Sequence, residues 1–317
     1  MSNTQRRKVV VAIPLAQPLL DQLSVHDVTY LPTARWDKAA LAAAVAEAEG
    51  LLVSSHIKVN REVIAAASKL QVISTMSVGS DHIDVDAARE RGISVTITPV
   101  LTDAVADLTM ALITMLARRI PEGMRSVSEN RWVEGTAMLG SDLAGKVLLL
   151  VGFGRIGQAV AKRALASGMD VRYVDPRDDL PAVSGVSRVA RLAEGLAAAD
   201  FVSLHIDLNP GTRKLMGRPE FASMKRTAFF VNTSRGGVVD QPALAAALTN
   251  GQIDGAALDV LANEPPDPND AVLTAPNVII VPHIGSATRE TREAMAQCAV
   301  DNLLQVLRGE KSPFALG

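Results

Sequence analysis

The chain has 317 residues, of which 48% are hydrophobic and 21% are charged. At roughly 150 residues per domain, this length predicts two domains, each large enough to bury a core. The 32 basic and 34 acidic side chains nearly cancel to a net charge of −2, and aromatic residues make up 3% of the chain. This balance excludes a strongly basic surface, and we expect neither nucleic acid nor a membrane as partner.

The chain contains one cysteine, Cys298. A single cysteine cannot form an intrachain disulfide, and no cysteine or histidine cluster has metal-ligand spacing, so we expect no metal site. An apolar run at 9–13 follows three basic residues and ends at Pro14. Because this run is too short for a signal-peptide core or a membrane span, we expect a cytoplasmic protein.

Short β-branched runs alternate with alanine-rich stretches in the first third of the chain, which is typical of a parallel α/β architecture. Gly50 and Gly92 follow two of the alanine-rich stretches as helix stops. The predicted strands are 8–13, 51–53, 71–74 and 94–97, and the predicted helices are 36–48, 60–67 and 84–91. These elements predict one sheet covered by helices.

A long amphipathic stretch at 103–119 carries leucine and methionine at helical spacing and precedes Pro121. We predict a helix that bridges two domains and is stopped by this proline. Strand and helix alternation restarts after a loop at 132–141. The further strands are predicted at 146–151, 171–174, 201–204, 227–232, 255–259 and 278–281, and the last helix at 288–308. The continuous apolar character of these strands predicts burial on both faces.

A glycine-rich loop follows the strand at 146–151 and opens a helix. Its pattern is GxGxxG, formed by Gly152, Gly154 and Gly157 with Arg155 and Ile156 between them. The first glycine permits a tight turn, the second lets backbone approach a pyrophosphate, and the third lets the helix pack against the strand. The helix N-terminus then faces the phosphates, so the loop predicts a dinucleotide site.

An acidic residue ends the next predicted strand, 175 − 152 = 23 residues after the first glycine. This residue, Asp175, stands where a carboxylate accepts hydrogen bonds from the adenosine ribose and repels a 2′-phosphate. We therefore favour NAD(H) over NADP(H). Arg177 could reach a 2′-phosphate if Asp175 turned away, so NADP(H) stays open. A solvated turn with no ligand is the alternative interpretation.

Three polar residues follow predicted strands of the second sheet, where open α/β sheets bind their ligands. They are Arg235, Glu264 and His283. A lone arginine here is usually a surface ion pair, and a lone histidine is usually a core residue. Three such residues behind a dinucleotide loop instead predict a catalytic site.

These motifs, in this order, resemble the D-isomer-specific 2-hydroxyacid dehydrogenase family over nearly the whole chain. The resemblance includes a loop at 77–84, SVGSDHID. The narrower match, to glyoxylate/hydroxypyruvate reductases, is carried by residues 72–79, 98–103 and 282–288.

The family resemblance implies a fold of two Rossmann-like, doubly wound parallel-sheet domains with the active site in the cleft between them. Residues 1–99 and 286–317 would form a discontinuous, flavodoxin-like substrate-binding domain, and residues 100–285 the NAD-binding domain. It also implies a homodimer, formed through the helix near Asp103 and an arm near Trp132. Because the arm residues 135–137 are small, we expect relaxed selection of substrate size.

Reduction of a 2-keto acid needs a hydride at the carbonyl carbon and a proton at its oxygen. By resemblance, His283 supplies the proton, and Glu264 orients His283 and favours its protonated form. Arg235 would bind the substrate carboxylate and polarise the ketone. The amides of Val78 and Gly79 would hold the other carboxylate oxygen.

The resemblance also implies cofactor contacts beyond the glycine loop and Asp175. The residues concerned are Thr102, His205, Ile206, Thr212, Thr233, Ser234, Asp259 and Gly285, together with Arg235 and His283. Two departures from the family stand out. The family commonly has proline after the histidine and one further position, whereas this chain reads His205-Ile206-Asp207-Leu208, which puts the local turn in doubt. Reductases of the nearest branch often prefer NADPH, whereas Asp175 points to NADH.

Other functions stay open from the sequence. One is a dehydrogenase for a bulkier 2-keto acid, for 2-ketogluconate or for phosphite. A formate dehydrogenase is disfavoured, because those enzymes carry an amide where Glu264 stands. A dinucleotide-sensing protein like the co-repressors of this fold keeps the same three polar residues, but we see no basic patch or peptide-docking arm here.

Overall fold

The computed structural model describes residues 6–32 and 38–316. The chain divides into two compact units. Unit 1 consists of Met1–Leu101 and Thr288–Gly317, and unit 2 of Thr102–Ala287. Both boundaries fall two residues after the expected ones, 99/100 and 285/286. No helix in the part of the chain that the structure describes is long and apolar enough to cross a membrane.

Unit 1 contains a five-stranded sheet in the order β2-β1-β3-β4-β5. The strands are β1 (Lys8–Val11), β2 (Asp27–Tyr30), β3 (Gly50–Val53), β4 (Val72–Thr75) and β5 (Ser94–Thr96). Every pair is parallel, and Val9 faces Val28 on one side and Gly50 on the other. This is the flavodoxin-like strand order, which confirms the expected fold.

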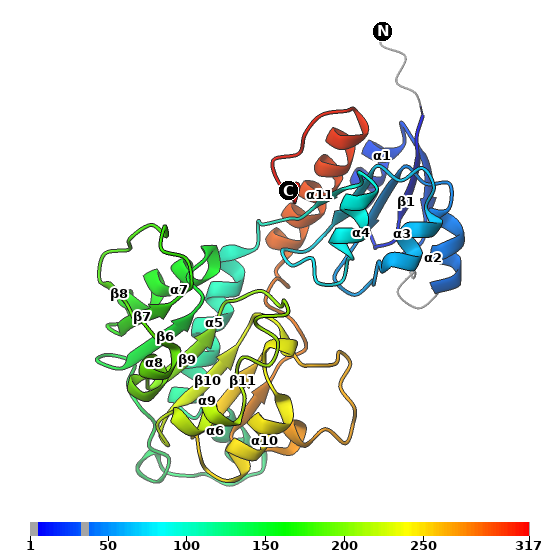
Figure 1. Cartoon of the computed structure of the whole chain (residues 1–317). Helices are drawn as coiled ribbons and strands as arrows, with labels where there is room; N and C mark the ends of the chain where they lie inside the picture. The colour runs from blue at the N-terminus through cyan, green and yellow to red at the C-terminus, as the bar shows by residue number, and fades with distance from the viewer. Residues whose placement is uncertain (1–5, 33–37, 317) are drawn as a thin grey trace. The chain divides into compact units, whose positions relative to one another are not determined.

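The helices of unit 1 include one from the far end of the chain. They are α1 (Gln17–Leu23), α2 (Lys38–Val45), α3 (Arg61–Ala66), α4 (Val85–Glu90) and α11 (Arg289–Leu307). Figure 1 shows α11, in red, beside the blue strands of the N-terminal sheet. A Cβ on Gly50 would lie 3.1 Å from Leu303 and 3.2 Å from Leu307, so α11 packs closely on β3. Residues 36 and 37 of the predicted helix 36–48 lie outside the described residues.

Unit 2 contains a seven-stranded parallel sheet in the order β12-β11-β10-β9-β6-β7-β8. Its strands are β6 (Val147–Val151), β7 (Asp170–Val174), β8 (Val186–Arg188), β9 (Phe201–Leu204), β10 (Phe229–Asn232), β11 (Gly255–Leu258) and β12 (Val278–Ile280). Strands β9, β10 and β11 are buried along their whole length, as their apolar sequences predicted. The order reverses between β6 and β9, where a doubly wound sheet binds nucleotides.

Six α-helices and three short 3₁₀ helices surround this sheet. The α-helices are α5 (Thr102–Ala117), α6 (Ile120–Ser128), α7 (Arg155–Ala166), α8 (Leu192–Ala198), α9 (Arg218–Ser223) and α10 (Gln241–Thr249). The 3₁₀ helices are η1 (Gly135–Ala137), η2 (Gly236–Val238) and η3 (Ala271–Thr274). Helix α5 packs against α7, where Arg163 pairs with Asp103 at 3.0 Å and with Asp107 at 2.6 Å.

The prediction of one bridging helix at 103–119 is wrong in two respects. Helix α5 belongs wholly to unit 2 and ends at Ala117. Pro121 then lies in the first turn of α6, because a proline there sacrifices no helical hydrogen bond. The break between the two helices falls at Arg119, whose φ of 52° is left-handed.

Candidate active site

The glycine loop lies between β6 and α7 in unit 2. Gly152 has a φ of +94°, and a Cβ there would lie 2.4 Å from the carbonyl oxygen of His205. A Cβ on Gly157 would lie 2.5 Å from the carbonyl oxygen of Gly152. Only glycine allows this turn and this close helix approach.

The N-terminus of α7 fits a pyrophosphate. Its N-cap residue is Gly154, and no side chain caps the helix. The first amides of the helix therefore point outward without an intrahelical partner, as a bound anion requires. A Cβ on Gly154 would meet only the Arg177 guanidinium, at 3.7 Å, so the backbone here is open to a ligand. The residues present fit a dinucleotide.

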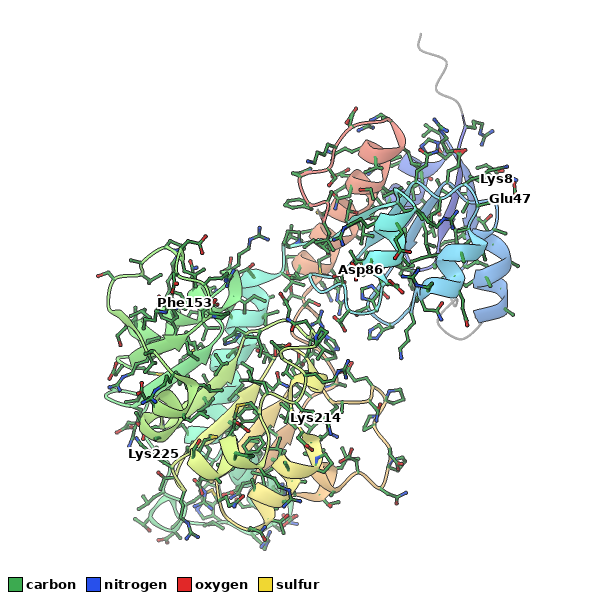
Figure 2. All side chains as sticks on the ribbon, viewed as in Figure 1. Lys8, Glu47, Asp86, Phe153, Lys214 and Lys225 are labelled. Atoms are coloured by element: carbon green, nitrogen blue, oxygen red, sulfur yellow. The ribbon has the colours of Figure 1, made fainter. Side chains whose placement is uncertain are left out.

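Phe153, labelled in Figure 2, supports the loop from the inside. Its side chain is fully buried, and its ring stacks on Tyr173 with centroids 4.0 Å apart. Its amide donates to Oδ2 of Asp175 at 2.8 Å. The loop and the acidic residue of the next strand are thus tied directly together.

Asp175 is only 5% exposed, so it does not lie in a solvated turn. Besides Phe153, its partner is Arg177, which donates to Oδ1 from the amide at 3.0 Å and from Nε at 2.9 Å. A second guanidinium nitrogen of Arg177 donates to Oδ2 at 2.8 Å. These bonds, chiefly those from the guanidinium, hold the pKa of Asp175 well below its usual range. The carboxylate is ionised, and protein donors fill all its acceptor positions.

The turn after β9 lacks the family proline and is held by hydrogen bonds of its own. His205 donates its amide to the carbonyl of Val151 at 2.8 Å, and its Nε2 lies 2.9 Å from the hydroxyl of Ser203. Burial lowers the pKa of His205 to about 3, so the ring is neutral. Further along, Thr212 donates to the carbonyl of Asp207 at 2.6 Å and accepts from the amide of Asn209 at 2.9 Å. Side-chain hydrogen bonds therefore fix this turn.

Arg235 follows β10 in a turn shaped by a buried amide. Asn232 is 1% exposed; its Oδ1 accepts from the amide of Ser234 at 3.0 Å, and its Nδ2 donates to the carbonyl of Arg235 at 2.9 Å. Thr233, next to Asn232, bonds the hydroxyl of Thr109 on α5 at 2.9 Å. Asn232 was not among the predicted site residues, although an amide at the end of the apolar strand Phe229–Asn232 is a usable signal.

Glu264 and His283 face one another. Oε2 of Glu264 lies 2.7 Å from Nδ1 of His283, and the two side chains are 29% and 30% exposed. Oε1 of Glu264 accepts from the amide of Leu261 at 3.1 Å. Glu264 is exposed and His283 half-buried, so a ligand can reach both groups.

Asp259 holds the turn that carries His283. Its backbone carbonyl accepts from the amide of His283 at 2.9 Å. Its carboxylate accepts from the amides of Ile284 at 2.6 Å and Gly285 at 2.9 Å. His283 has a left-handed φ of 54°, so this clamp stabilises an uncommon conformation. Burial raises the pKa of Asp259, which is 2% exposed.

The loop with Val78 and Gly79 lies in unit 1, after β4. A network of buried hydrogen bonds holds this loop in place. Thr75 bonds Nε2 of His82 at 2.9 Å and the hydroxyl of Ser77 at 3.1 Å. Ser77 in turn donates to the carbonyl of Gly79 at 2.5 Å. His82, a residue of the SVGSDHID loop, lies within this network and is 8% exposed.

Unit 2 thus brings most of the predicted residues to the carboxyl edge of one sheet. The residues that directly follow its strands are Gly152, Asp175, His205, Ile206, Thr233, Ser234, Arg235 and Asp259, and His283 follows close behind β12. Thr102 begins α5, and Thr212 closes the turn after His205. A doubly wound sheet with a glycine loop, an ionised carboxylate and an Arg, Glu and His set defines a dinucleotide-dependent oxidoreductase.

Comparison with known proteins agrees with this class. The NAD binding domain of the D-isomer specific 2-hydroxyacid dehydrogenases matches residues 110–285. The glyoxylate/hydroxypyruvate reductase B of Klebsiella pneumoniae is 43% identical over 308 residues, which are 95% of either chain. The chain belongs to the D-isomer-specific 2-hydroxyacid dehydrogenase family, as the sequence motifs predicted, and it is an NAD(P)-dependent oxidoreductase.

Two solved structures are similar to this protein over nearly its whole chain. A protein of Thermus thermophilus is 45% identical with a TM-score of 0.90, covering 98% of this chain and all of that one. The NADPH-dependent glyoxylate/hydroxypyruvate reductase of Sinorhizobium meliloti, solved with NADP and malonate, is 32% identical with a TM-score of 0.87. That match covers 99% of this chain and 97% of the other.

Proposed function

We propose that this enzyme reduces glyoxylate and hydroxypyruvate to their 2-hydroxy acids. The observation that carries the proposal is the pair of Glu264 and His283, 2.7 Å apart at the carboxyl edge of the sheet that carries the dinucleotide loop. Formate oxidation needs no such acid and base. The names of the relatives from Klebsiella pneumoniae and Sinorhizobium meliloti support the choice of substrate.

Substrate binding is assigned to three groups. The guanidinium of Arg235 takes the carboxylate of the keto acid in a fork of two hydrogen bonds and polarises the keto oxygen. The amides of Val78 and Gly79 take the second carboxylate oxygen. Asn232 donates to the backbone carbonyl of Arg235, so the backbone from which the guanidinium extends is fixed.

Bound NAD(P)H supplies the hydride that adds to the keto carbon. His283 holds a proton at Nε2 and donates it to the keto oxygen as negative charge develops there. Glu264 faces Nδ1 at 2.7 Å and orients the ring for this transfer. In the reverse direction the neutral ring accepts the proton from the hydroxy acid.

We propose NADH as the preferred coenzyme. Asp175 is ionised at the end of β7, where a 2′-phosphate would meet a second negative charge. Its carboxylate is already bound to Arg177, so NADH must displace this side chain, of which 53% is exposed. A guanidinium displaced in this way is free to rotate into solvent.

We further propose a homodimer and a cytoplasmic location. Ten large hydrophobic side chains are exposed among the described residues. Six of them lie in one short stretch of unit 2: Ile120, Met124, Val127, Trp132, Val133 and Leu139. Exposed apolar surface concentrated in this way marks a protein interface. For the location, one cysteine agrees with a reducing compartment.

The direct test follows the oxidation of NADH, through the absorbance of the reduced nicotinamide, with glyoxylate, hydroxypyruvate, pyruvate and 2-ketogluconate. The reduction of NAD by phosphite is measured in parallel. We expect turnover with the first two keto acids. His283→Ala should lower kcat by about 10³-fold or more, whereas the Kd for NADH stays within about twofold. Turnover only with a bulkier acid or with phosphite would replace this assignment, and tight NADH binding without any turnover would indicate a sensor.

A further inference from the structure

The segment that carries Glu264 runs from Leu261, after β11, to Asp270, before η3, and includes three prolines. Proline has no N–H to donate, so three positions of the segment add no backbone hydrogen bond. At the far end the amide of Asp270 donates to the carbonyl of Asp267 at 2.9 Å. The carboxylate of Glu264 must be held 2.7 Å from His283. A polar group outside the segment that bonds both of its ends would add to this order.

Gln241 is that group. It is the first residue of α10, and only 6% of it is exposed. Its Oε1 accepts from the amide of Ala262 at 2.8 Å, and its Nε2 donates to Oδ2 of Asp270 at 2.5 Å. An amide N–H can only donate and a carboxylate can only accept, so the two partners settle the orientation of the side chain. One glutamine side chain therefore closes both ends of the segment.

The near end of this clamp is directly connected to Glu264. The amide of Leu261, one residue before Ala262, donates to Oε1 of Glu264 at 3.1 Å. The same Leu261–Ala262 peptide is pressed against Gly236, where a Cβ would lie 1.9 Å from the Leu261 carbonyl oxygen. Moving this peptide would displace Leu261, whose own N–H lies on the preceding peptide and is the donor to Glu264, and with it the carboxylate that faces His283.

We propose that Gln241 is a positioning residue for the reduction. It holds the Leu261–Ala262 peptide and Asp270 so that the carboxylate of Glu264 stays against Nδ1 of His283. This inference rests on the function proposed above. The residues that orient a catalytic histidine are commonly supported by further hydrogen bonds of this kind, and their loss typically costs about 10- to 100-fold in activity. Gln241 acts only through Glu264.

The chemistry of the clamp selects glutamine. A glutamate at this position would place a second carboxylate 2.5 Å from that of Asp270, which is unfavourable for two negative charges. Methionine has a similar length and volume but neither donates nor accepts a strong hydrogen bond. Gln241→Met therefore removes both bonds with little change in packing.

The experiment is a double-mutant cycle with glyoxylate and NADH, using Gln241→Met, Glu264→Gln and the combined variant. We expect Gln241→Met to lower kcat about tenfold, with the KM for glyoxylate and the Kd for NADH within about twofold. In the Glu264→Gln background the second substitution should have no further effect. Gln252→Met, an exposed glutamine after the other end of α10, is the matched control and should keep the wild-type kcat.

Two outcomes overturn the inference: a wild-type kcat for Gln241→Met, or effects of the two substitutions that multiply. If Gln241→Met does not fold, Asp270→Ala and Asp270→Asn test the far end of the clamp. Asn keeps one acceptor oxygen, which can accept from Nε2 of Gln241 only if its NH₂ group replaces the oxygen that accepts from the amide of Val272. We therefore expect kcat to fall in the alanine variant and to recover in part in the asparagine variant. Equal kcat values in both overturn the inference as well.

A readout without turnover separates this inference from the proposed function. Nitrogen-15 spectra of labelled histidine, assigned with His283→Ala, report the hydrogen bond at Nδ1 of His283. We expect this signal to change in Gln241→Met and to stay unchanged in Gln252→Met. An unchanged signal in Gln241→Met counts against the clamp. A wild type that reduces no keto acid, or a fully active Glu264→Gln, counts instead against the proposed function.

Discussion

At the scale of single residues, the coenzyme preference depends on one ion pair. Asp175 has no acceptor position left while Arg177 is bound, and a 2′-phosphate would gain a cation only if Arg177 left Asp175. Each charge-assisted hydrogen bond that is exchanged is worth about 1.5–3 kcal/mol. Asp175 therefore favours NADH, and Arg177, once released from Asp175, favours NADPH.

Substitution of either partner should move the preference in opposite directions. Asp175→Ala removes the negative charge and releases Arg177, so we expect the ratio of the Kd for NADPH to that for NADH to fall about tenfold or more. Arg177→Ala frees the carboxylate for the ribose and should raise the same ratio. Fluorescence titration with each coenzyme measures it. Asp178→Ala, an exposed neighbour paired with Arg188, is the control, and an unchanged ratio in Asp175→Ala would contradict the assignment.

His205 should make the free energy of unfolding depend on pH. Burial lowers its pKa in the folded state to about 3, while an unfolded histidine titrates near ~6.5. Between these two pH values His205 is protonated in the unfolded chain but not in the folded protein. The free energy of unfolding is therefore highest above about pH 6.5 and falls as the pH drops.

From pH 7 to pH 5 this residue alone should cost about 1–2 kcal/mol. Urea denaturation of the coenzyme-free protein at pH 5, 6, 7 and 8 measures the effect against His205→Asn, which does not titrate. The free energy of unfolding should fall less in the variant than in the wild type between pH 7 and pH 5. Between pH 7 and pH 8 it should change by the same amount in both proteins. A variant with the full wild-type slope would show that His205 is protonated in the folded state.

Some site residues can be recognised from spacing along the sequence, whereas others depend on contacts between residues that are distant in the sequence. Gly152 and Asp175 could be predicted because their spacing along the chain reflects local turn geometry. Gln241 could not, because its role depends on Ala262, 21 residues away, and on a buried environment that one sequence does not reveal. The same holds for the pairing of Asp175 with Arg177 rather than with solvent.

At the scale of elements, burial explains which strands the sequence predicts. Strands β9, β10 and β11 are buried on both faces and stand out as continuous apolar runs. Strands β2 and β8 were not predicted, because they lie at sheet edges and their mostly exposed residues carry no such pattern. Helix α1 was not predicted either, because its 7 residues bury only Leu19 and Leu23.

The contact between the loops after β10 and β11 gives a prediction at this scale. Gly236→Ala would place a Cβ 1.9 Å from backbone of Leu261, which cannot rotate away. We expect a loss of about 1–3 kcal/mol in the free energy of unfolding and a lower kcat, because the peptide beside Glu264 must shift. Gly237→Ala is the matched control, since its Cβ would meet only the flexible end of Leu208, at 2.8 Å. Equal losses in both variants would contradict this explanation.

At the scale of the whole molecule, unit 1 is built from both ends of the chain. Ser74 on β4 donates to the carbonyl of Ala299 at 2.7 Å, and Asn302 donates to the carbonyl of Ile97 at 3.0 Å. These bonds join α11 to the sheet across more than 200 residues of sequence, 299 − 74 = 225 in the first case. The N-terminal strands therefore complete their core only after the last helix has been made.

The exposed apolar stretch at 120–139 predicts the assembly of two chains. Trp132 is 83% exposed and Leu139 74%, and Leu139 also lines a cavity of about 590 Å³ beside α6. Apolar side chains of this size, left in water, favour association. Light scattering should therefore give about twice the chain mass of 33.5 kDa.

Met124→Asp with Leu139→Asp should shift the mass to that of one chain, because two carboxylates cannot be buried in an apolar interface without a large desolvation cost. Val25→Asp, at an apolar position of unit 1 that is 55% exposed, should remain dimeric. A wild type that is monomeric at micromolar concentration would overturn the proposal.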